Sequence, residues 1–304
     1  MNIRHKTTRT EFSWLLYLVF IFVLSAPASA QITPASPSAK PQPTPEPTTE
    51  KNFLNNILRD QKGIWTSPFH LQRDDAEWIA PLGLSIAALI ATDRHTSGEL
   101  VENGDNRDRL RISKDISYAG SLYALGGVST LFYVTGRMRH DERAKETGLL
   151  AAEALINSTI VSQALKGVSQ RQRPQVDNSS GEFFDGGSAF PSGHAINSWA
   201  VATVVAYEYG PRHPVVRYAS YGLATAISIS RFTGRRHFLS DVLVGSAMGY
   251  GIGRYLYHQH HDPSLDAENG KQISRVLKSK FFPAIAPAFS RQSHSYGASL
   301  AWNF

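Results

Sequence analysis

The sequence predicts an all-α protein, a helical bundle of about six core helices whose functional site lies at helix ends, followed by a short C-terminal tail resembling a β-hairpin. From residue 76 onward, long apolar stretches rich in Ala, Leu, Ile and Val follow one another, and stretches of this length favour helices over strands. Prolines at positions 174, 191, 211 and 214 punctuate these stretches. The chain shows no internal repeat and no dinucleotide-type glycine loop.

The first thirty residues predict an export signal. A basic start containing Arg4, Lys6 and Arg9 precedes the apolar run Trp14–Leu24, and small residues follow at positions 28–30. The apolar run is short for a membrane span, which needs about 20 residues. We therefore expect cleavage of residues 1–30 and an exported, periplasmic or cell-envelope protein, with an uncleaved anchor as the alternative.

Residues 31–52 predict a tether between this signal and the folded domain. The stretch 32–50 contains six prolines among Thr, Ser and Ala residues, a composition that favours extended polyproline II and does not build a core.

The helical domain is predicted over residues 53–260. Its expected helices cover residues 76–92, 114–137, 142–169, 192–208, 214–230 and 237–258. Several glycines within them indicate places where helices approach each other closely, namely Gly120, Gly126, Gly127, Gly245 and Gly249.

The tail, residues 261–304, has a different pattern. Alternation in its last residues, preceded by the stretch Phe281–Ser290, predicts a hairpin with a loop near Arg291–Ser293. We expect this hairpin to cap the bundle rather than to contact a membrane.

Membrane association is weakly indicated. The uncharged run Ile116–Gly136 reaches 21 residues, which is about the length of a span, but the mean hydropathy of the chain is only −0.24. We expect a bundle that is buried mainly in itself and lies in the periplasm, and peripheral or partial embedding in a membrane stays open.

Composition excludes several classes of function. Because the chain has no cysteine, it has no disulfide scaffold, thiolate metal site or cysteine nucleophile. The net charge of +6 is spread along the chain without a dense basic stripe, so no nucleic-acid partner is expected. This charge suits an anionic small substrate or an anionic membrane surface.

Two segments offer groups that bind anions. Lys166 and Arg173 are two helical turns apart and are expected to project from one face, with Pro174 ending the helix. Ser192 and Gly193 stand at a helix start, where a hydroxyl and free backbone N–H groups can hold an anion. His194 follows them directly.

A third segment, Ser230–Asp241, adds a nucleophile. His237 and Asp241 are four residues apart, and we expect them to share a helix face, where the carboxylate would accept the Nδ1 proton and leave Nε2 bare. Arg231 precedes a turn and can fold back toward the same point. Cations, N–H donors, a nucleophile and an acid are the groups that phosphoryl transfer needs.

Together, the three segments resemble the signature of the type 2 phosphatidic acid phosphatase and vanadium haloperoxidase superfamily over about residues 76–258. The matching positions are Lys166-x6-Arg173-Pro174, Pro191-Ser192-Gly193-His194 and Ser230-Arg231-x5-His237-x3-Asp241.

This resemblance implies a metal-independent phosphatase that hydrolyses phosphate esters through a phosphohistidine. His237 would attack phosphorus, Asp241 would orient His237, and His194 would protonate the leaving oxygen and then activate water. The implied phosphate-binding residues are Lys166, Arg173, Ser192, Gly193 and Arg231. No cofactor is implied, and vanadate is expected as an inhibitor. The substrate would be a lipid phosphate or a soluble monoester, and the oligomeric state is not predicted.

The sequence is compatible with two alternative functions. The motifs are also compatible with a vanadate-dependent haloperoxidase, in which vanadate is the cofactor, and with a non-catalytic envelope scaffold that keeps a relic site. His258, His260, His261 and Asp262 could suggest a metal site, but we expect a polar helix end that runs into the Pro263 turn.

Overall fold

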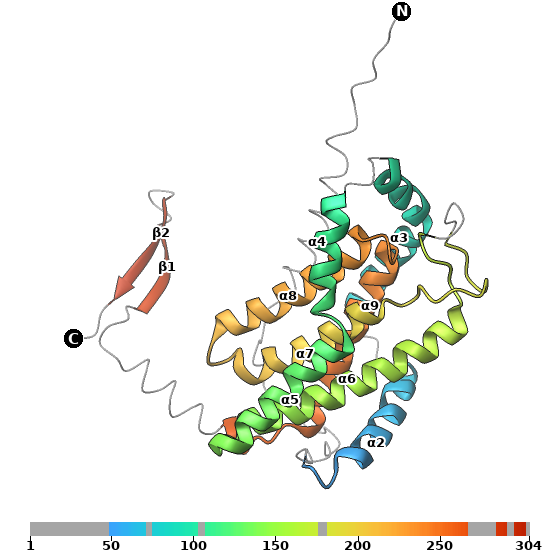
Figure 1. Cartoon of the computed structure of the whole chain (residues 1–304). Helices are drawn as coiled ribbons and strands as arrows, with labels where there is room; N and C mark the ends of the chain where they lie inside the picture. The colour runs from blue at the N-terminus through green and yellow to red at the C-terminus, as the bar shows by residue number, and fades with distance from the viewer. Residues whose placement is uncertain are drawn as a thin grey trace, which may run out of the picture. The chain divides into compact units, whose positions relative to one another are not determined.

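The computed structural model describes residues 49–70, 75–102, 107–175, 181–266, 284–290 and 295–301, and it confirms the predicted all-α class. The expected export signal and most of the tether lie outside the described residues. The helices are shown in Figure 1 and are α2 (Phe53–Thr66), η1 (Ser67–His70), α3 (Ala76–Glu102), α4 (Arg107–Tyr118), α5 (Leu122–Arg139), α6 (Glu142–Ser169), α7 (Gly193–Tyr209), α8 (Pro214–Thr233) and α9 (Leu239–His260).

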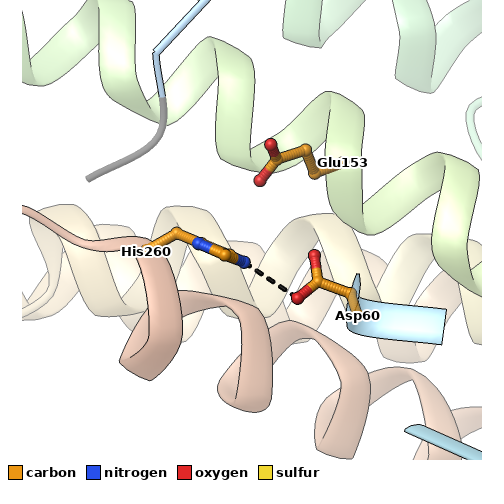
Figure 2. Close-up of side chains that lie close together, drawn as sticks. All are labelled: Asp60, Glu153 and His260. Atoms are coloured by element: carbon orange, nitrogen blue, oxygen red, sulfur yellow. Dashed lines mark hydrogen bonds and ion pairs between the residues drawn. The ribbon is translucent and has the colours of Figure 1, made fainter. Parts of the chain in front are cut away.

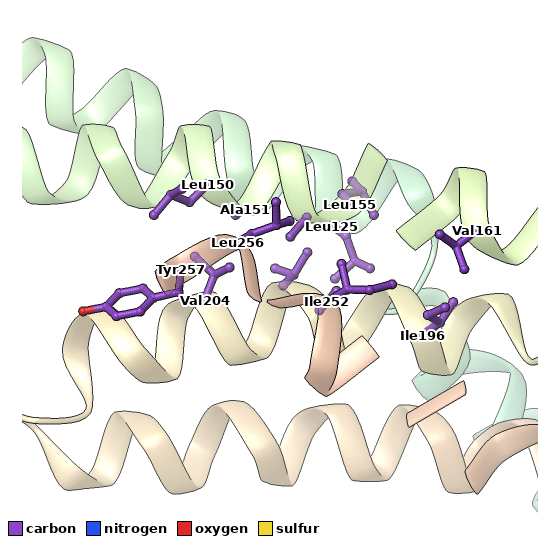
Figure 3. Packing of buried hydrophobic residues seen from close by; sticks show 13 residues of the cluster. Leu125, Leu150, Ala151, Leu155, Val161, Ile196, Val204, Ile252, Leu256 and Tyr257 are labelled. Atoms are coloured by element: carbon purple, nitrogen blue, oxygen red, sulfur yellow. The ribbon is translucent and has the colours of Figure 1, made fainter. Parts of the chain in front are cut away.

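The hydrophobic core lies where α6, α7 and α9 pack together, with one contribution from α5 (Figure 3). Leu150, Ile196 and Leu256 are fully or almost fully buried in it. Burying one such side chain contributes about 1.5–3 kcal/mol, and truncating one to Ala typically costs about 2–5 kcal/mol. The cluster comprises Leu125, Leu150, Ala151, Ala154, Leu155, Val161, Ile196, Ala200, Val201, Val204, Ile252, Leu256 and Tyr257.

Close contact between α7 and α9 depends on glycines of α9. A Cβ atom at Gly249 would lie 2.2 Å from the Ile196 carbonyl oxygen, and one at Gly253 would lie 2.5 Å from the Ala200 carbonyl oxygen. Both distances are too short for a side chain, so the expectation of close packing at Gly249 is confirmed. This packing brings the beginning of α7 beside the beginning of α9, where Ser192 N–H donates to the Asp241 carbonyl at 3.0 Å.

The prediction of one helix over residues 114–137 was wrong. The chain turns between α4 and α5, where Gly120 N–H donates to the Ser117 carbonyl at 3.0 Å and Ser121 Oγ accepts from Ala124 N–H at 3.2 Å. A Cβ atom at Gly120 would lie 2.4 Å from Ile227 Cγ2, so α8 fills the space that a continued helix would need. Composition alone did not reveal this tertiary constraint.

That turn also interrupts the run that reached the length of a membrane span. Among the described residues, α6 is the one helix whose length and apolar composition suffice to cross a membrane, and 56% of its most apolar stretch is buried in the bundle. A core helix of a bundle has the same character.

One helix boundary and one additional helix also differ from expectation. Helix α9 begins at Leu239 rather than at residue 237, so His237 precedes the helix. Helix α2 was not predicted as an element, although Ile57 on its inner face is buried. The remaining predicted helices agree with α3, α6, α7 and α8, and their ends differ from the predicted ones by up to ten residues.

Two strands follow in the tail. β1 (Ala284–Ser290) pairs antiparallel with β2 (Ser295–Ala301), with Ala284 opposite Ala301 and Ser290 opposite Ser295. This pairing agrees with the predicted hairpin, whose loop near residues 291–293 lies outside the described residues.

Candidate active site

The buried histidine His237 lies in the short loop between α8 and α9. Its Nδ1 is 2.7 Å from the carbonyl oxygen of Ala189, which precedes α7. Because a carbonyl oxygen only accepts hydrogen bonds, Nδ1 carries the proton and Nε2 keeps its lone pair. Burial lowers the pKa of His237, and Asp241 opposes this effect. The ring is therefore neutral near pH 7, with a nucleophilic Nε2.

The expected role of Asp241 as the direct acceptor of the His237 Nδ1 proton was wrong. Its Oδ2 is 3.7 Å from Nδ1, which is beyond hydrogen-bond distance. Because His237 precedes α9, the two residues do not share a helix face. Oδ2 instead accepts from Phe238 N–H at 2.9 Å and so caps the first turn of α9. Asp241 thus faces His237 as a nearby negative charge.

Arg171 is a site-supporting residue that the sequence analysis missed. It is fully buried, and its guanidinium donates to Asp241 Oδ1 at 2.6 Å and to Asp93 Oδ2 at 2.8 Å. The rings of Phe183 and Phe238 flank it at 4.7 and 4.3 Å, an arrangement that favours a cation. Arg171 therefore connects α3 to the beginning of α9 and fixes the Asp241 carboxylate.

A serine completes this buried network. Ser240 Oγ accepts from Arg171 at 2.7 Å and donates to Asp93. Burial raises the pKa of Asp93, although the hydrogen bonds from Ser240 and Arg171 act against this rise. The one signal for Arg171 was its place two residues before Arg173. Asp93 lies in a helix far away in the chain, and its sequence surroundings gave no signal.

Ser192, Gly193 and Lys166 are brought together as predicted. A Cβ atom at Gly193 would lie 3.2 Å from Lys166 Nζ and 3.4 Å from Ser162 Oγ, so glycine keeps this space open. The first N–H groups of α7 lack intrahelical acceptors and point toward the same end of the helix. They supply donors for an anion at the mouth of α7.

Two buried hydroxyls at this helix mouth are unsatisfied. Neither Ser192 Oγ nor Ser162 Oγ has a hydrogen-bond partner within the described residues, although both side chains are buried. Such groups are rare in folded proteins. They indicate a binding site for a polar ligand at this point.

The three predicted cations lie close enough to repel one another. Burial lowers the pKa of Lys166, and the charges of Arg173 and Arg231 lower it further. Burial and the neighbouring arginines lower the pKa of Arg231 to about 10. Arg173 donates to Ser188 Oγ at 3.3 Å, and Arg231 donates to Ser117. This concentration of positive charge favours an anion.

His194 lies inside the same positive region. Burial first, and then the charges of Arg231 and of other neighbouring cations, lower the pKa of His194 to about 3. The ring is therefore neutral at pH 7 in this state. Its Cδ2 lies 3.3 Å from the position of a Cβ on Gly120, which places it beside the turn between α4 and α5.

The histidines at the other end of α9 do not form one cluster. His258 is exposed, whereas His260 and His261 are buried and contact different acidic residues. His261 Nδ1 lies 2.7 Å from Glu146 and 3.1 Å from Glu208. Although burial acts against it, these hydrogen bonds raise the pKa of His261 to about 10. The predicted polar helix end is thus partly wrong, because its histidines are buried in ion pairs.

Comparisons with known proteins agree with the sequence resemblance. A family model described as the PAP2 superfamily matches residues 147–264, a range that contains every predicted site residue. Over 70 residues the chain is 43% identical to a Lipid A 1-phosphatase of Porphyromonas gingivalis, and this match covers 23% of the chain and 16% of that protein. The chain thus spans about a sixth of the length of that curated relative.

Similar solved structures have low sequence identity. A transmembrane PAP2-type phosphatidylglycerolphosphate phosphatase of Bacillus subtilis is 20% identical with a TM-score of 0.47, covering 66% of this chain and 97% of that one. LpxE of Aquifex aeolicus is 20% identical with a TM-score of 0.41, covering 52% and 91%. A bacterial vanadium-dependent iodoperoxidase is 18% identical with a TM-score of 0.42, covering 57% and 48%. The predicted resemblance to the superfamily is confirmed by the family model.

Proposed function

We propose that this protein is a phosphatase that hydrolyses phosphate esters with His237 as its nucleophile. One observation carries the proposal. The Nδ1 proton of His237 is held by the Ala189 carbonyl, which leaves Nε2 free in a region where cations and unsatisfied hydroxyls gather. A bare nucleophile beside an uncompensated positive region suits attack on a phosphoryl group.

The reaction has two steps. In the first, Nε2 of His237 bonds to phosphorus while the bond between phosphorus and the ester oxygen breaks, and His194 gives its proton to that oxygen. In the second, His194 takes a proton from water, the resulting hydroxide attacks phosphorus, and the nitrogen–phosphorus bond breaks. Phosphate leaves and both histidines return to their starting states.

The charges of the site determine when His194 can act as an acid. Its pKa of about 3 in this state reflects burial and neighbouring cations. A bound phosphoryl dianion adds negative charge and opposes that effect, so the pKa of His194 rises when substrate binds. The acid is then protonated mainly when there is an ester to cleave.

No metal ion is needed for this mechanism. Lys166, Arg173 and Arg231 supply the positive charge that stabilises the equatorial oxygens in the transition state, and the Ser192 hydroxyl and the Gly193 N–H supply further donors. We accordingly propose that a chelator leaves catalysis intact.

A lipid phosphate is the substrate class that the surface favours. Tyr118, Leu122 and Tyr123 are 71%, 49% and 88% exposed, and they flank the turn that contacts His194. Exposed apolar groups at this place suit an apolar leaving group or a membrane surface. We propose that the protein is an exported enzyme and that these three side chains, the apolar rim of the site, face the boundary between lipid and water.

A trapping experiment tests the nucleophile. We expect rapid quenching without acid to recover an acid-labile phosphoenzyme from a substrate labelled on its phosphoryl group. The label should be absent from His237→Ala, and turnover should fall by about 10⁴-fold or more. A label that persists in His237→Ala would overturn the proposed mechanism. Halide oxidation with vanadate and peroxide, without phosphate release, would establish the haloperoxidase instead.

A substrate panel tests the lipid preference. The panel contains a soluble aryl monoester, a long-chain phosphatidate and an isoprenyl pyrophosphate. We expect Tyr123→Ser to lower kcat/KM about tenfold for the lipids and to leave the soluble ester unchanged. Met138→Ser is the matched control, because Met138 is 76% exposed at the far end of the same helix. Equal losses on all substrates would contradict the apolar rim.

A further inference from the structure

A second cluster of ionisable groups lies far from the proposed active site. Asp60 of α2, Glu153 of α6 and His260 of α9 point toward one another in the interior (Figure 2). Their exposed fractions are 1%, 0% and 2%. Along α9, His260 is about 28 Å from Asp241 at 1.5 Å per residue. The mechanism above uses none of these three side chains.

The cluster is incompletely satisfied. His260 Nε2 lies 2.8 Å from Asp60 Oδ1, and one ligand-type atom from each of the three residues lies within 4.8 Å of the others. The second carboxylate oxygen of Asp60, Oδ2, is buried and has no hydrogen-bond partner in the described part of the chain. Two carboxylates buried this close together favour a compensating positive charge.

The neighbouring cluster around His261 shows what such compensation looks like. It also contains one histidine and two carboxylates, which here belong to Glu146 and Glu208. There, Arg143 enters the interior and binds Glu208 Oε2 at 3.0 Å, while His261 contacts both glutamates and Asp266. The guanidinium of Arg143 thus provides the compensating positive charge at the cluster around His261.

We propose that Asp60, Glu153 and His260 bind a divalent transition-metal ion, with Zn²⁺ as the best match. One imidazole nitrogen and two carboxylate oxygens form a donor set that suits zinc. Metal bonds of about 2.0–2.2 Å require the 2.8 Å contact between His260 and Asp60 to open slightly. The ion would replace the proton shared between them, and that proton would leave to solvent.

The site is structural rather than catalytic. It would join α2 to α6 and α9, and it would add to the existing contact in which Gln61 Nε2 donates to Asn157 Oδ1 at 2.8 Å. Because the site is remote from His237, it stands apart from the proposed phosphatase function. A chelator should therefore loosen α2 and leave turnover unchanged.

Metal retention by the full-length protein tests the proposal. The protein is stripped with a chelator, exposed separately to Zn²⁺, Mn²⁺ or Ca²⁺, passed through gel filtration and analysed for metal. We expect about one equivalent of Zn²⁺, a higher melting temperature and slower amide exchange in residues 53–66. We expect Asp60→Asn and Glu153→Gln each to weaken Zn²⁺ binding at least tenfold.

A control separates this site from adventitious binding by surface histidines. His258→Gln removes an exposed imidazole two residues from His260 and should retain the full equivalent of Zn²⁺. If Asp60→Asn and Glu153→Gln do not fold, Co²⁺ replaces Zn²⁺ in the wild-type chain. The visible spectrum of the bound Co²⁺ should then show inner-sphere nitrogen and oxygen ligands. Less than a fifth of an equivalent of every metal in the wild type would overturn the proposal. Equal Zn²⁺ binding by the wild type and Asp60→Asn would also overturn it.

Discussion

The two ends of α9 have opposite electrostatic character. At its beginning, burial and the nearby charges of Arg231, Lys166 and Arg173 lower the pKa of His194 to about 3. At its end, carboxylates surround His260 and His261, and the pKa of His261 rises to about 10. The histidines near the two ends of α9 thus experience electrostatic fields of opposite sign.

The comparison shows that a buried charge without a partner of opposite sign in the chain indicates the charge of the ligand that binds there. Structural ion pairs are balanced within the chain, as Arg143 balances Glu208. The proposed phosphate site has excess positive charge and unsatisfied hydroxyls, whereas the Asp60 cluster has an unsatisfied carboxylate oxygen. The proposed phosphate site therefore favours an anion, and the Asp60 cluster favours a cation.

Removal of Arg171 should give the largest effect on stability. Arg171→Met leaves Asp93 and Asp241 buried without their cation, and breaking such a pair costs about 3–5 kcal/mol. Urea unfolding, followed by circular dichroism, measures the loss. A change below about 1 kcal/mol would show that the network contributes little to the fold.

Arg173→Met offers the contrasting result at the active-site end. Burial lowers the pKa of Arg173, and the charge of Arg236 lowers it further, so its positive charge is disfavoured where it lies. We expect kcat/KM to fall about 10²–10³-fold, because a charge that stabilises the transition state is lost. The free energy of unfolding should stay constant or rise by up to about 1 kcal/mol. A parallel loss of stability and activity would remove the distinction between Arg171 and Arg173.

The pH dependence of stability should differ between the two ends. The raised pKa of His261 contributes stability that is full below pH 6.5 and is lost as pH rises through about 10. The depressed pKa of His194 has the opposite sign, because stability is full above pH 6.5 and is lost as pH falls toward 3. Allowing for partial solvent screening, each effect is about 1 kcal/mol.

Unfolding curves at pH 5, 7 and 9 check these signs. His261→Gln should flatten the change between pH 7 and 9, and His194→Gln should flatten the change between pH 7 and 5. If each variant instead followed the wild-type curve throughout, the fields at the two ends of α9 would be misassigned.

Ser192→Ala should give the smallest effect. The hydroxyl is buried without a partner among the described residues, so its removal is expected to leave stability unchanged or to raise it by about 1 kcal/mol. Its loss should raise KM for the phosphate ester severalfold. Steady-state kinetics and thermal unfolding of the same samples separate the two effects, and a marked loss of stability would assign Ser192 to structure alone.

Sequence patterns predicted the bundle and the helix ends that carry the proposed site residues, because those features are local. Spacing and helix punctuation located the start of α7 and the basic end of α6, with His194 and Lys166 on them. The turn at Gly120 was missed, because it depends on the contact with Ile227 of a distant helix. The acceptor of the His237 proton was also missed, because a main-chain carbonyl carries no sequence signal.

That carbonyl has a consequence for how the protein tolerates mutation. The group that fixes the tautomer of His237, the proposed nucleophile, belongs to the backbone of Ala189, and no substitution at that position can delete it. In a saturation library, position 189 should therefore reject large side chains for lack of space, since Ala189 is fully buried, while accepting Gly or Ser. Selection at position 189 would then limit the size of the side chain without requiring a particular chemical group.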